Sequence, residues 1–392
     1  MVIAGEASGD LLAAELVTAL ANNTVGFRPR FFGAGGPRMA AAGVDLAFDL
    51  TQHSVIGLIE VLKNYGKFKR LFSELLQLAI ERQPDVIICV DFSGFNRRFA
   101  HAVQEYVRAH RSPFFNWQPK IVQYVSPQVW ASRPGRAHAM ARDFDLLLTI
   151  FPFEKPWYAE RVPELKVEFV GHPMVDRHQA QSSKLKARTG PSSVLLLPGS
   201  RVGELKRHLP VMLAALKLIR EKSPGLSVVM VLPDEVLAAQ ARSLGVPADL
   251  KVQIGNLPEA LAQADLAIAS TGTVTMECAY FGVPTVALYK TSWSTYQIGK
   301  RIITVKHLAM PNLLANETLF PEFVQHEATP ENISRAALEL LNDEPRRNRI
   351  KTRLTEVIAS LGGPGASRRA AAAIMGMLEP GGAGMSAGQR EG

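Results

Sequence analysis

Short apolar runs alternate with longer amphipathic stretches along almost the whole chain. The runs at 85–91, 120–126 and 145–153 are rich in Val, Ile and Leu, which is typical of strands buried on both faces of a parallel sheet. The stretches between them carry apolar residues at helical spacing. A repeated strand–helix order of this kind predicts a doubly wound α/β fold.

The alternation occurs in two series. The first covers residues 1–173, and the polar stretch 175–193 that follows has no apolar periodicity, so we interpret it as a linker. Alternation restarts with "SVLLLPGSR" and defines a second series over 174–345. The pattern therefore predicts two Rossmann-like domains that face a cleft, the default place for a ligand.

The C-terminal part is helical in its pattern. Helices are predicted at 330–342, at about 345–360 and at 364–378. We treat 346–378 as a separate set of C-terminal helices. The Gly-rich tail 379–392 is expected to be disordered.

Composition narrows the class of partner. The 392 residues carry a net charge of +8, which indicates an anionic partner such as a nucleotide, a phospholipid surface or a phosphorylated substrate. The sequence lacks the cysteine and histidine spacing of a zinc finger, and its basic residues do not alternate with aromatic ones. Nucleic acid is therefore a weak interpretation of the charge. Cys89 and Cys278 each lie in an apolar run, which predicts buried, reduced thiols and fits a cytoplasmic protein. The sequence also predicts no signal peptide and no membrane-spanning segment.

The turn Ser270-Thr271-Gly272-Thr273 lies between a predicted strand and a predicted helix. Small residues there expose backbone N–H groups at a helix N-terminus, where phosphate binds well. Glu277 follows Thr273 by four residues on the same helix face and suits sugar hydroxyls. A nucleoside diphosphate offers both groups, although an ordinary helix cap with a solvated Glu fits the same pattern.

A second loop of this kind follows the first strand of the second domain. It contains Gly199, Ser200 and Arg201, and the guanidinium of Arg201 presents a charged fork suited to a diphosphate. An exposed basic turn is the alternative. Two such loops at the carboxyl ends of strands in one domain favour binding.

The first domain opens with "AGEASGD", a strand-to-helix turn. Its candidate binding residues are Gly5, Ser8, Gly9 and Asp10. The turn lacks the glycine fingerprint of a dinucleotide site. Its helix N-terminus suits a phosphate, and a simple cap by Ser8 or Asp10 explains the residues equally well.

Two further loops of the first domain follow buried strands. Asp91 ends the run 85–91 and is a candidate general base, or else a cap for the next helix, in which Asn96 lies near the start. The loop "YVSPQVWAS" offers binding or packing side chains, namely Ser126, Gln128 and Trp130.

The segment 54–72 combines an apolar stretch with a basic cluster. Such a segment suits an anionic membrane surface, and a core helix with a solvated basic end is the alternative. The cluster consists of Lys63, Lys67, Lys69 and Arg70.

These motifs together resemble lipid-A-disaccharide synthases, which are GT-B glycosyltransferases. The resemblance covers about residues 1–378 and rests on "AGEASGD", "VDFSGFN", "YVSPQVWAS", "VGHP", "LPGSR", the Ser270–Pro284 region and "MPNLLA". Ser132 replaces a second Trp that the family motif carries, and Ser-Gly stands at 93–94 where Pro-Asp is frequent. Neither change touches Asp91 or Asn96.

The resemblance implies a GT-B fold and a reaction without metal or cofactor. UDP-2,3-diacylglucosamine would donate its sugar, with inversion, to 2,3-diacylglucosamine 1-phosphate (lipid X) in lipid A biosynthesis of Gram-negative bacteria. It implies Asp91 as base, Arg201 and the tip at Thr271–Thr273 as partners of UDP, Glu277 on the ribose and Asn312 as a further catalytic residue. It also implies a peripheral protein on the inner face of the inner membrane, whose C-terminal helices pack back on the first domain or form a homodimer.

Two rival functions remain open at this point. A UDP-N-acetylglucosamine 2-epimerase on the same fold would release UDP without transfer to an acceptor. A non-catalytic UDP-sugar or lipid-binding protein would bind UDP without turnover, and Asp91 would then only cap a helix.

Overall fold

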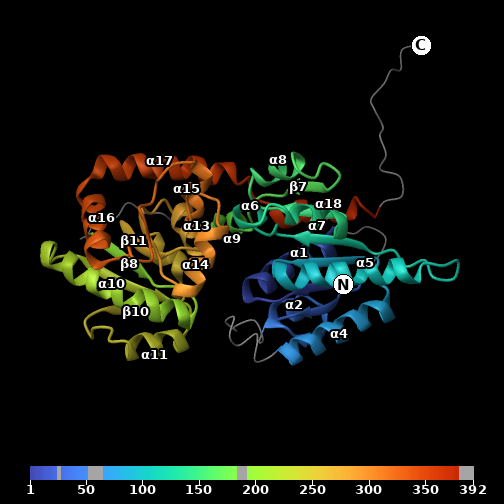
Figure 1. Ribbon diagram of the computed structural model, residues 1–392. Helices are drawn as coiled ribbons and strands as arrows, with labels where there is room; N and C mark the ends of the chain where they lie inside the picture. The colour runs from blue at the N-terminus through green and yellow to red at the C-terminus, as the bar shows by residue number, and fades with distance from the viewer. Residues whose placement is uncertain (24–27, 52–64, 183–191, 379–392) are drawn as a thin grey trace, which may run out of the picture. The chain divides into compact units, whose positions relative to one another are not determined.

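A computed structural model describes residues 1–23, 28–51, 65–182 and 192–378 of the chain (Figure 1). It divides into two compact units of similar construction. The first contains Met1–Trp130, Pro134–Pro173 and Pro364–Gly392, and the second contains Ala131–Arg133 and Met174–Gly363. The main division, between Pro173 and Met174, is the boundary used in the sequence analysis.

The first unit is built on a seven-stranded parallel sheet in the order β3-β2-β1-β4-β5-β6-β7. The chain leaves β1 toward β2 and β3, and then continues on the other side with β4, so the strand order reverses between β1 and β4. The strands are β1 Val2–Ala4, β2 Phe32–Gly35, β3 Asp45–Asp49, β4 Val86–Val90, β5 Lys120–Tyr124, β6 Leu146–Thr149 and β7 Lys166–Phe169.

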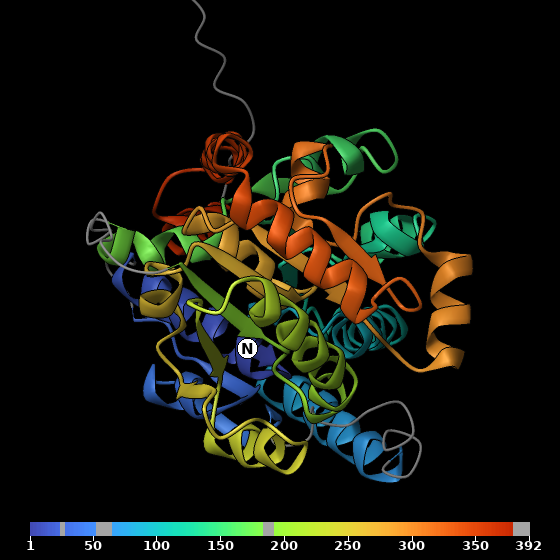
Figure 2. The same cartoon turned by 90° about the vertical axis from the view of Figure 1, so that its left-hand side faces the viewer.

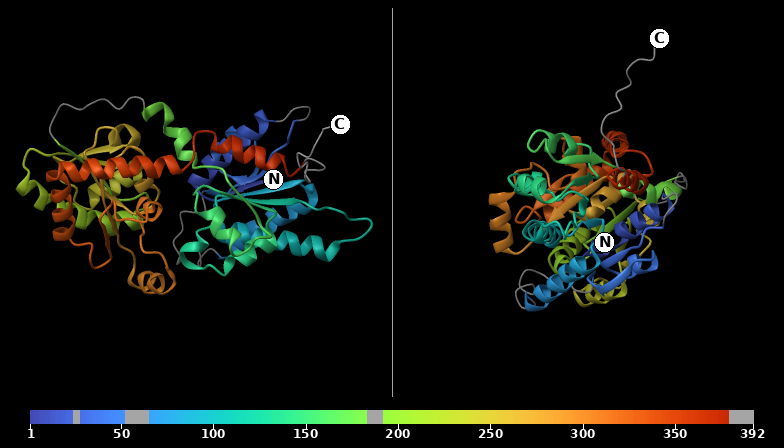
Figure 3. Two further views of the ribbon diagram at one scale, coloured as in Figure 1. Left: turned by 90° about the horizontal axis from the view of Figure 1, so that it is seen from above. Right: turned by 90° about the vertical axis from the view of Figure 1, so that its right-hand side faces the viewer.

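Helices cover this sheet, and the right-hand view of Figure 3 shows the unit end-on. The described helices up to β7 are α1 Ala7–Asn22, α2 Pro37–Ala41, α4 Tyr65–Arg82, α5 Ser93–His110, α6 Val129–Ser132, α7 Arg136–Asp143 and α8 Glu154–Ala159. Of the expected membrane segment 54–72, residues 54–64 lie outside the described residues, so only its basic end can be located, at the start of α4.

The second unit has a six-stranded parallel sheet in the order β10-β9-β8-β11-β12-β13, seen from its own side in Figure 2. Its strand order reverses between β8 and β11. The strands are β8 Ser193–Leu197, β9 Ser227–Leu232, β10 Lys251–Ile254, β11 Leu266–Ser270, β12 Thr285–Tyr289 and β13 Glu322–Val324. The helices are α9 Pro173–Ser182, α10 Val202–Lys222, α11 Glu235–Ser243, α12 Leu257–Leu261, α13 Thr273–Tyr280, α14 Trp293–Ile302, α15 Met310–Ala315, α16 Pro330–Asn342 and α17 Glu344–Ser360.

The predicted linker at 175–193 was wrong in its first part, because α9 occupies Pro173–Ser182. Its buried face is short and includes a polar residue. Met174 and His178, four residues apart, are 3% and 7% exposed. A histidine in a core position hides the apolar periodicity on which the sequence interpretation relied.

The C-terminal helices divide between the two units. Helix α17 belongs to the second unit, whereas α18 (Ala366–Met375) belongs to the first and lies along α1 of the same chain (Figure 3, left). Arg369 fastens α18 there, since its Nε donates to the carbonyl oxygen of Val170 at 2.7 Å. Dimerisation through this region stays a prediction.

Asp10 belongs to the architecture of the first unit. Its carboxylate is 2% exposed and accepts hydrogen bonds from the backbone N–H groups of Gly36, Arg38 and Met39 at 2.8–3.0 Å. These are donors of the first turn of α2, which have no acceptor within their own helix. We therefore assign Asp10 a structural role and no longer expect it to bind substrate.

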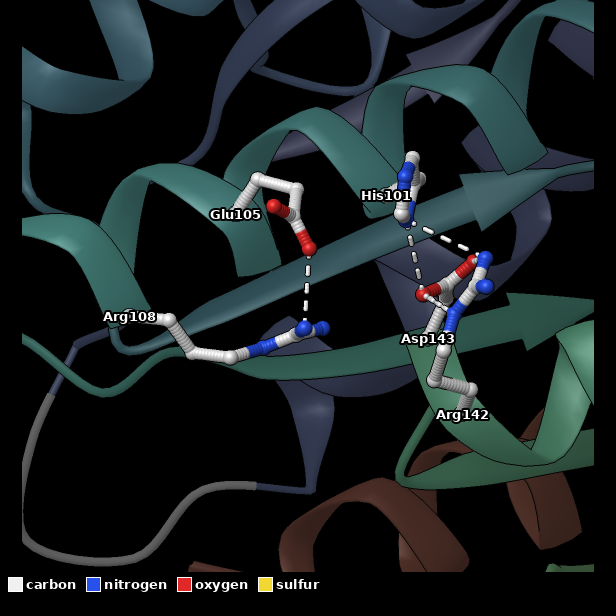
Figure 4. A network of polar contacts seen from close by, with 5 residues as sticks. All are labelled: His101, Glu105, Arg108, Arg142 and Asp143. Carbon is white, nitrogen blue, oxygen red and sulfur yellow. Dashed lines mark hydrogen bonds and ion pairs between the residues drawn. The ribbon is translucent and has the colours of Figure 1, made fainter.

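A polar network joins α5 to α7 on the same unit (Figure 4). Asp143 is fully buried and accepts two hydrogen bonds from the Arg142 guanidinium, at 2.7 and 2.8 Å, while His101 Nδ1 lies 3.1 Å from its Oδ1. Burial alone would raise the pKa of Asp143, but these hydrogen bonds outweigh it and lower the pKa.

Candidate active site

The second unit contains a cavity of about 380 Å³ at the carboxyl ends of its strands. It is lined by the loops that follow β8, β9, β10 and β11, so it lies where the strand order reverses. Ligands of open α/β sheets bind at this position. Its lining includes Gly199–Arg201, Glu204, Val231–Pro233, Gly255, Leu257, Ser270–Val274 and Glu277.

Helix α13 begins at this cavity with its first turn open. Its N-cap is Gly272, at φ +143° and ψ −158°, a conformation that L-residues rarely adopt, and no side chain caps the helix there. A Cβ atom at Gly272 would meet nothing within 4 Å. The open first turn and the helix dipole together make a site for a phosphate group.

Glu277 lies one turn into α13 and lines the same cavity. Its side chain is 27% exposed, and its Oε1 is 3.7 Å from Nε2 of His178 on α9. The structure therefore brings together Ser270, Thr271, Gly272, Thr273 and Glu277, with a carboxylate able to accept hydrogen bonds from hydroxyl groups.

The loop after β8 forms a second wall of the cavity. Gly199 has φ +128°, and the N–H of Ser200 donates to Oε2 of Glu204 at 3.1 Å. The Glu204 carboxylate thus holds the turn that precedes α10, and no side chain caps the helix itself. The Arg201 side chain is 65% exposed, with its Nη1 3.9 Å from Oε1 of Glu204, so a guanidinium stands at the mouth of the cavity.

His208, which the sequence interpretation did not assign, holds this wall in place. It is fully buried; its Nδ1 is 2.9 Å from the carbonyl oxygen of Pro198, and its Nε2 accepts from the N–H of Lys290 at 3.0 Å. Because Nε2 is an acceptor, the proton must be on Nδ1, which donates to Pro198. Burial lowers the pKa of His208, in agreement with this neutral tautomer.

The first unit has its own candidate site where its strand order reverses, at the ends of β1 and β4. A Cβ atom at Gly5 would lie 2.2 Å from the Phe92 ring, so only glycine fits there. A Cβ at Gly9 would lie 3.7 Å from Cβ of Asp91. The "AGEASGD" turn and Asp91 are therefore neighbours, with Ser8 exposed beside them.

The loop after β5 is fixed by a buried glutamate of α8. Glu154 is 1% exposed and accepts hydrogen bonds from Trp130 Nε1 at 3.0 Å and from the N–H of Phe151 at 3.1 Å. Ser126 is also buried, with its Oγ 3.0 Å from the Tyr158 hydroxyl. Trp130 and Ser126 thus anchor the loop, while Gln128 is exposed and available to a ligand.

Asn312 lies in the interior of the second unit. Its Oδ1 accepts from the N–H groups of Leu319 and Phe320 at 2.9 and 2.8 Å, and its Nδ2 donates to the Phe320 carbonyl oxygen and to Glu322 at 2.7 and 2.6 Å. With its hydrogen-bonding capacity used in this way, Asn312 braces the segment between α15 and β13. We no longer assign it a catalytic contact.

Asn96 is likewise fully buried, and its Nδ2 donates to the carbonyl oxygens of Val90 and Asp91. It supports the backbone of the site rather than reaching a ligand.

Both cysteines are free and buried, and burial raises the pKa of the Cys89 and Cys278 thiols to about 12, so neither is a ready nucleophile. No cluster of metal-ligating side chains occurs among the residues described.

Two doubly wound units, each with a candidate site at the point where its strand order reverses, define the GT-B class of glycosyltransferases and related epimerases. Residues 1–375 match the profile of the lipid-A-disaccharide synthetase family. The chain belongs to this family, whose members are glycosyltransferases of lipid A biosynthesis.

Named relatives agree over the full length. The lipid-A-disaccharide synthase of Trichlorobacter lovleyi is 37% identical over 391 residues, which cover 97% of each chain. That of Geobacter metallireducens is 36% identical over 389 residues, covering 96% of this chain and 97% of the relative.

Solved structures support the fold. A UDP-GlcNAc 2-epimerase of Methanocaldococcus jannaschii superposes with a TM-score of 0.60 at 11% identity, covering 95% of this chain and 98% of that one. The calicheamicin glycosyltransferase superposes with a TM-score of 0.57 at 16% identity, covering 97% and 98%.

The Glu154 anchor leads to a prediction about stability and pH. Burial raises the pKa of Glu154 to about 7 from its ordinary 4.5, although hydrogen bonds from Trp130 and the backbone oppose the shift. Since the folded pKa is the higher one, the stability that protonated Glu154 contributes is complete below about pH 4.5 and is lost as the pH rises through about 7.

Urea unfolding of the wild type and of Glu154→Gln, measured between pH 5 and pH 8, tests this. We expect the free energy of unfolding of the wild type to fall relative to the variant by on the order of 3 kcal/mol across this range. Parallel pH curves for the two proteins would show that Glu154 titrates as an ordinary carboxyl.

Proposed function

We propose that this chain transfers the diacylglucosamine unit of UDP-2,3-diacylglucosamine to lipid X, with inversion, and releases UDP. The observation that carries the proposal is the uncapped start of α13 with the Glu277 carboxylate one turn further along the same helix. A nucleoside diphosphate needs both features, a phosphate site and an acceptor for ribose hydroxyls. The family relation supplies the sugar and lipid parts of the assignment.

The proposed nucleotide site is the cavity of the second unit. The diphosphate would lie against the backbone N–H groups of the first turn of α13, with Arg201 balancing the charge that develops on the leaving group. The ribose hydroxyls would donate to Glu277. The cavity's 380 Å³ falls within the usual range for small-molecule sites, and the base would fill its wall at Val231–Pro233 and Leu257.

The proposed acceptor site is the first unit, around Asp91, Ser8 and Gln128. The Asp91 carboxylate would take the proton of the acceptor's 6-hydroxyl while that oxygen forms a bond to C1 of the donor sugar. The bond between C1 and the β-phosphate oxygen breaks in the same step, and its electron pair leaves with UDP. One displacement of this kind inverts C1 and needs no covalent intermediate.

The UDP site predicts a selective loss of affinity. Arg201→Ala and Glu277→Gln should each weaken UDP binding about tenfold, because each removes a charge-assisted contact. Arg220 lies at the other end of α10 and pairs with Asp249 at 2.7 Å, so Arg220→Ala is the matched control and should bind UDP normally. Isothermal titration calorimetry decides the matter, and equal affinity for the Arg201 and Arg220 variants would refute the diphosphate role.

The base assignment predicts a loss of turnover without a loss of UDP binding. Asp91→Asn should lower kcat by roughly 10²–10⁴-fold, the usual effect of removing a general base. Asp85 precedes the same strand at its opposite end, so Asp85→Asn serves as control. The assay mixes donor and labelled lipid X in detergent and follows labelled disaccharide and UDP. Normal kcat in Asp91→Asn would remove Asp91 as base, and UDP release without disaccharide would point to an epimerase.

We further propose that the chain contacts an anionic membrane surface, on the inner face of the inner membrane, through α14. Among the described helices none is long and apolar enough to cross a bilayer. Helix α14 has no buried residue; Trp293 and Ile298 are 74% and 56% exposed, and its last turn carries Lys300 and Arg301. Exposed aromatic and aliphatic side chains beside cations suit the surface of an anionic bilayer.

Sedimentation with vesicles that contain a fifth to a third anionic lipid tests this surface. The triple variant Trp293→Ser, Lys300→Ser, Arg301→Ser should lose at least about thirtyfold in vesicle affinity, since each of the two cations contributes roughly 1 kcal/mol near the surface. A control variant removes comparable groups elsewhere on the unit, with Val236→Ser, Lys217→Ser and Lys222→Ser. If both variants lose the same vesicle affinity, the loss reflects net charge alone, and the assignment of the membrane contact to α14 is wrong.

A further inference from the structure

Gln123 is a polar residue in the buried part of a strand. It lies in β5 and is fully buried. Its side-chain Nε2 is 3.1 Å from the carbonyl oxygen of Asp91, 3.1 Å from that of Val125 and 3.4 Å from that of Tyr124. One amide group therefore joins the ends of β4 and β5, the two strands that lead into the candidate acceptor site.

The backbone that Gln123 contacts has an unfavourable conformation. Asp91, Phe92 and Val125 have φ of +49°, +40° and +65°, in the left-handed region that non-glycine residues rarely adopt. Each such residue costs roughly 1–2 kcal/mol, and β-branched Val125 is an outlier there. Conformations of this kind persist only where the surrounding structure holds them.

A second buried amide acts on the same carbonyl group. Asn96 Nδ2 donates to the Asp91 carbonyl oxygen at 2.9 Å from the side of α5, while Gln123 approaches it from β5. A carbonyl oxygen has two lone pairs, so these two amides account for both. The Asp91 peptide is thereby fixed, and with it the direction in which the Asp91 side chain leaves the backbone.

The sheet itself does not need the Gln123 side chain. The backbone of Gln123 pairs with Cys89 of β4 and Leu147 of β6, and this backbone pairing does not involve the Gln123 side chain. An apolar side chain of similar size would fill the same space without donating hydrogen bonds. The side-chain amide therefore serves the left-handed backbone that follows β4 and β5, where it donates to the carbonyl oxygens of Asp91 and Val125.

A strand glutamine also contacts the carbonyl oxygens of a left-handed turn at the cavity of the second unit. Gln253 lies in β10, and its Nε2 is 3.1 Å from the Gly255 carbonyl oxygen and 3.2 Å from that of Asn256. Gly255 and Asn256 also have positive φ, +68° and +49°. In each unit a strand glutamine thus holds a left-handed turn at the carboxyl edge of the sheet.

We infer that Gln123 is a positioning residue for glycosyl transfer, which acts by holding the Asp91 backbone in its left-handed turn. The inference rests on the proposed role of Asp91 as base. Because Gln123 is fully buried, its effect reaches the reaction through the placement of the Asp91 carboxylate.

The test replaces Gln123 with Met, which has a similar length and no donor. We expect kcat to fall about 10–100-fold, as a small misplacement of a catalytic group does. The affinity for UDP, measured by calorimetry, should stay within about twofold, because the proposed nucleotide site lies in the other unit. The matched control is Gln77→Leu on the exposed face of α4, which should leave kcat unchanged.

A double-mutant cycle with Asp91→Asn separates positioning from general damage. If Gln123 acts through Asp91, adding Gln123→Met to Asp91→Asn leaves the residual turnover of that variant unchanged, whereas an independent role multiplies the two losses. Gln123→His keeps one nitrogen donor and should retain more turnover than the Met variant. If the Met variant does not fold, the His variant enters the cycle in its place.

Three results would overturn the inference: unchanged kcat in Gln123→Met, losses that multiply in the double variant, or a parallel loss of UDP affinity. The proposed function fails in a different way. If Asp91→Asn alone keeps full turnover, Asp91 is not the base, whatever Gln123 does. If Asp91→Asn is inactive and Gln123→Met is fully active, only the positioning inference fails.

Discussion

The candidate site of the second unit depends on the backbone N–H groups in the first turn of α13. Such groups have no acceptor in their own helix and must find one elsewhere. The parallel sheet brings this turn to the edge where its strand order reverses, and Gly272 gives the backbone a conformation that only glycine adopts readily. The cavity, the exposed Arg201 and Glu277 all lie around this open helix end.

Several other helix starts of the second unit are capped by side chains of the chain itself. Asp234, Thr329 and Asp343 cap α11, α16 and α17 with their own side chains. The first turn of α2 is capped by Asp10 from another helix. The first turn of α13 has no such cap, and it lines the cavity.

Both units share a second principle, which is that polar side chains buried beneath a site hold its backbone. His208 joins the loop after β8 to the segment after β12, and Glu154 fixes the loop after β5. These contacts link residues 10 to 82 positions apart in sequence. In the second unit the residues that face the cavity need such support, because glycines and exposed side chains do not hold a loop in place by themselves.

The sequence pattern predicts the fold well because apolar periodicity reports local structure. The run 85–91 contains β4, and the helices at 330–342 and 345–360 agree with α16 and α17 within one residue. The Thr273–Glu277 spacing is also local, since it lies within one helical turn. Helix α9 was missed because His178 occupies a core position on it.

The supporting residues could not be predicted in this way. Glu154 and Gln123 are buried polar residues, and only the folded chain shows which donors and acceptors meet them. Asp10 and Asn312 show the converse. A motif marks them as candidate site residues, yet their polar atoms are engaged with the backbone inside the fold.

A crystal structure of the protein with UDP bound tests the central claim most directly. The account predicts β-phosphate oxygens about 3 Å from the backbone nitrogens of the first turn of α13, with a ribose hydroxyl donating to Glu277. UDP bound with its phosphates away from α13, for example at the start of α1 in the first unit, would contradict the assignment of the two sites.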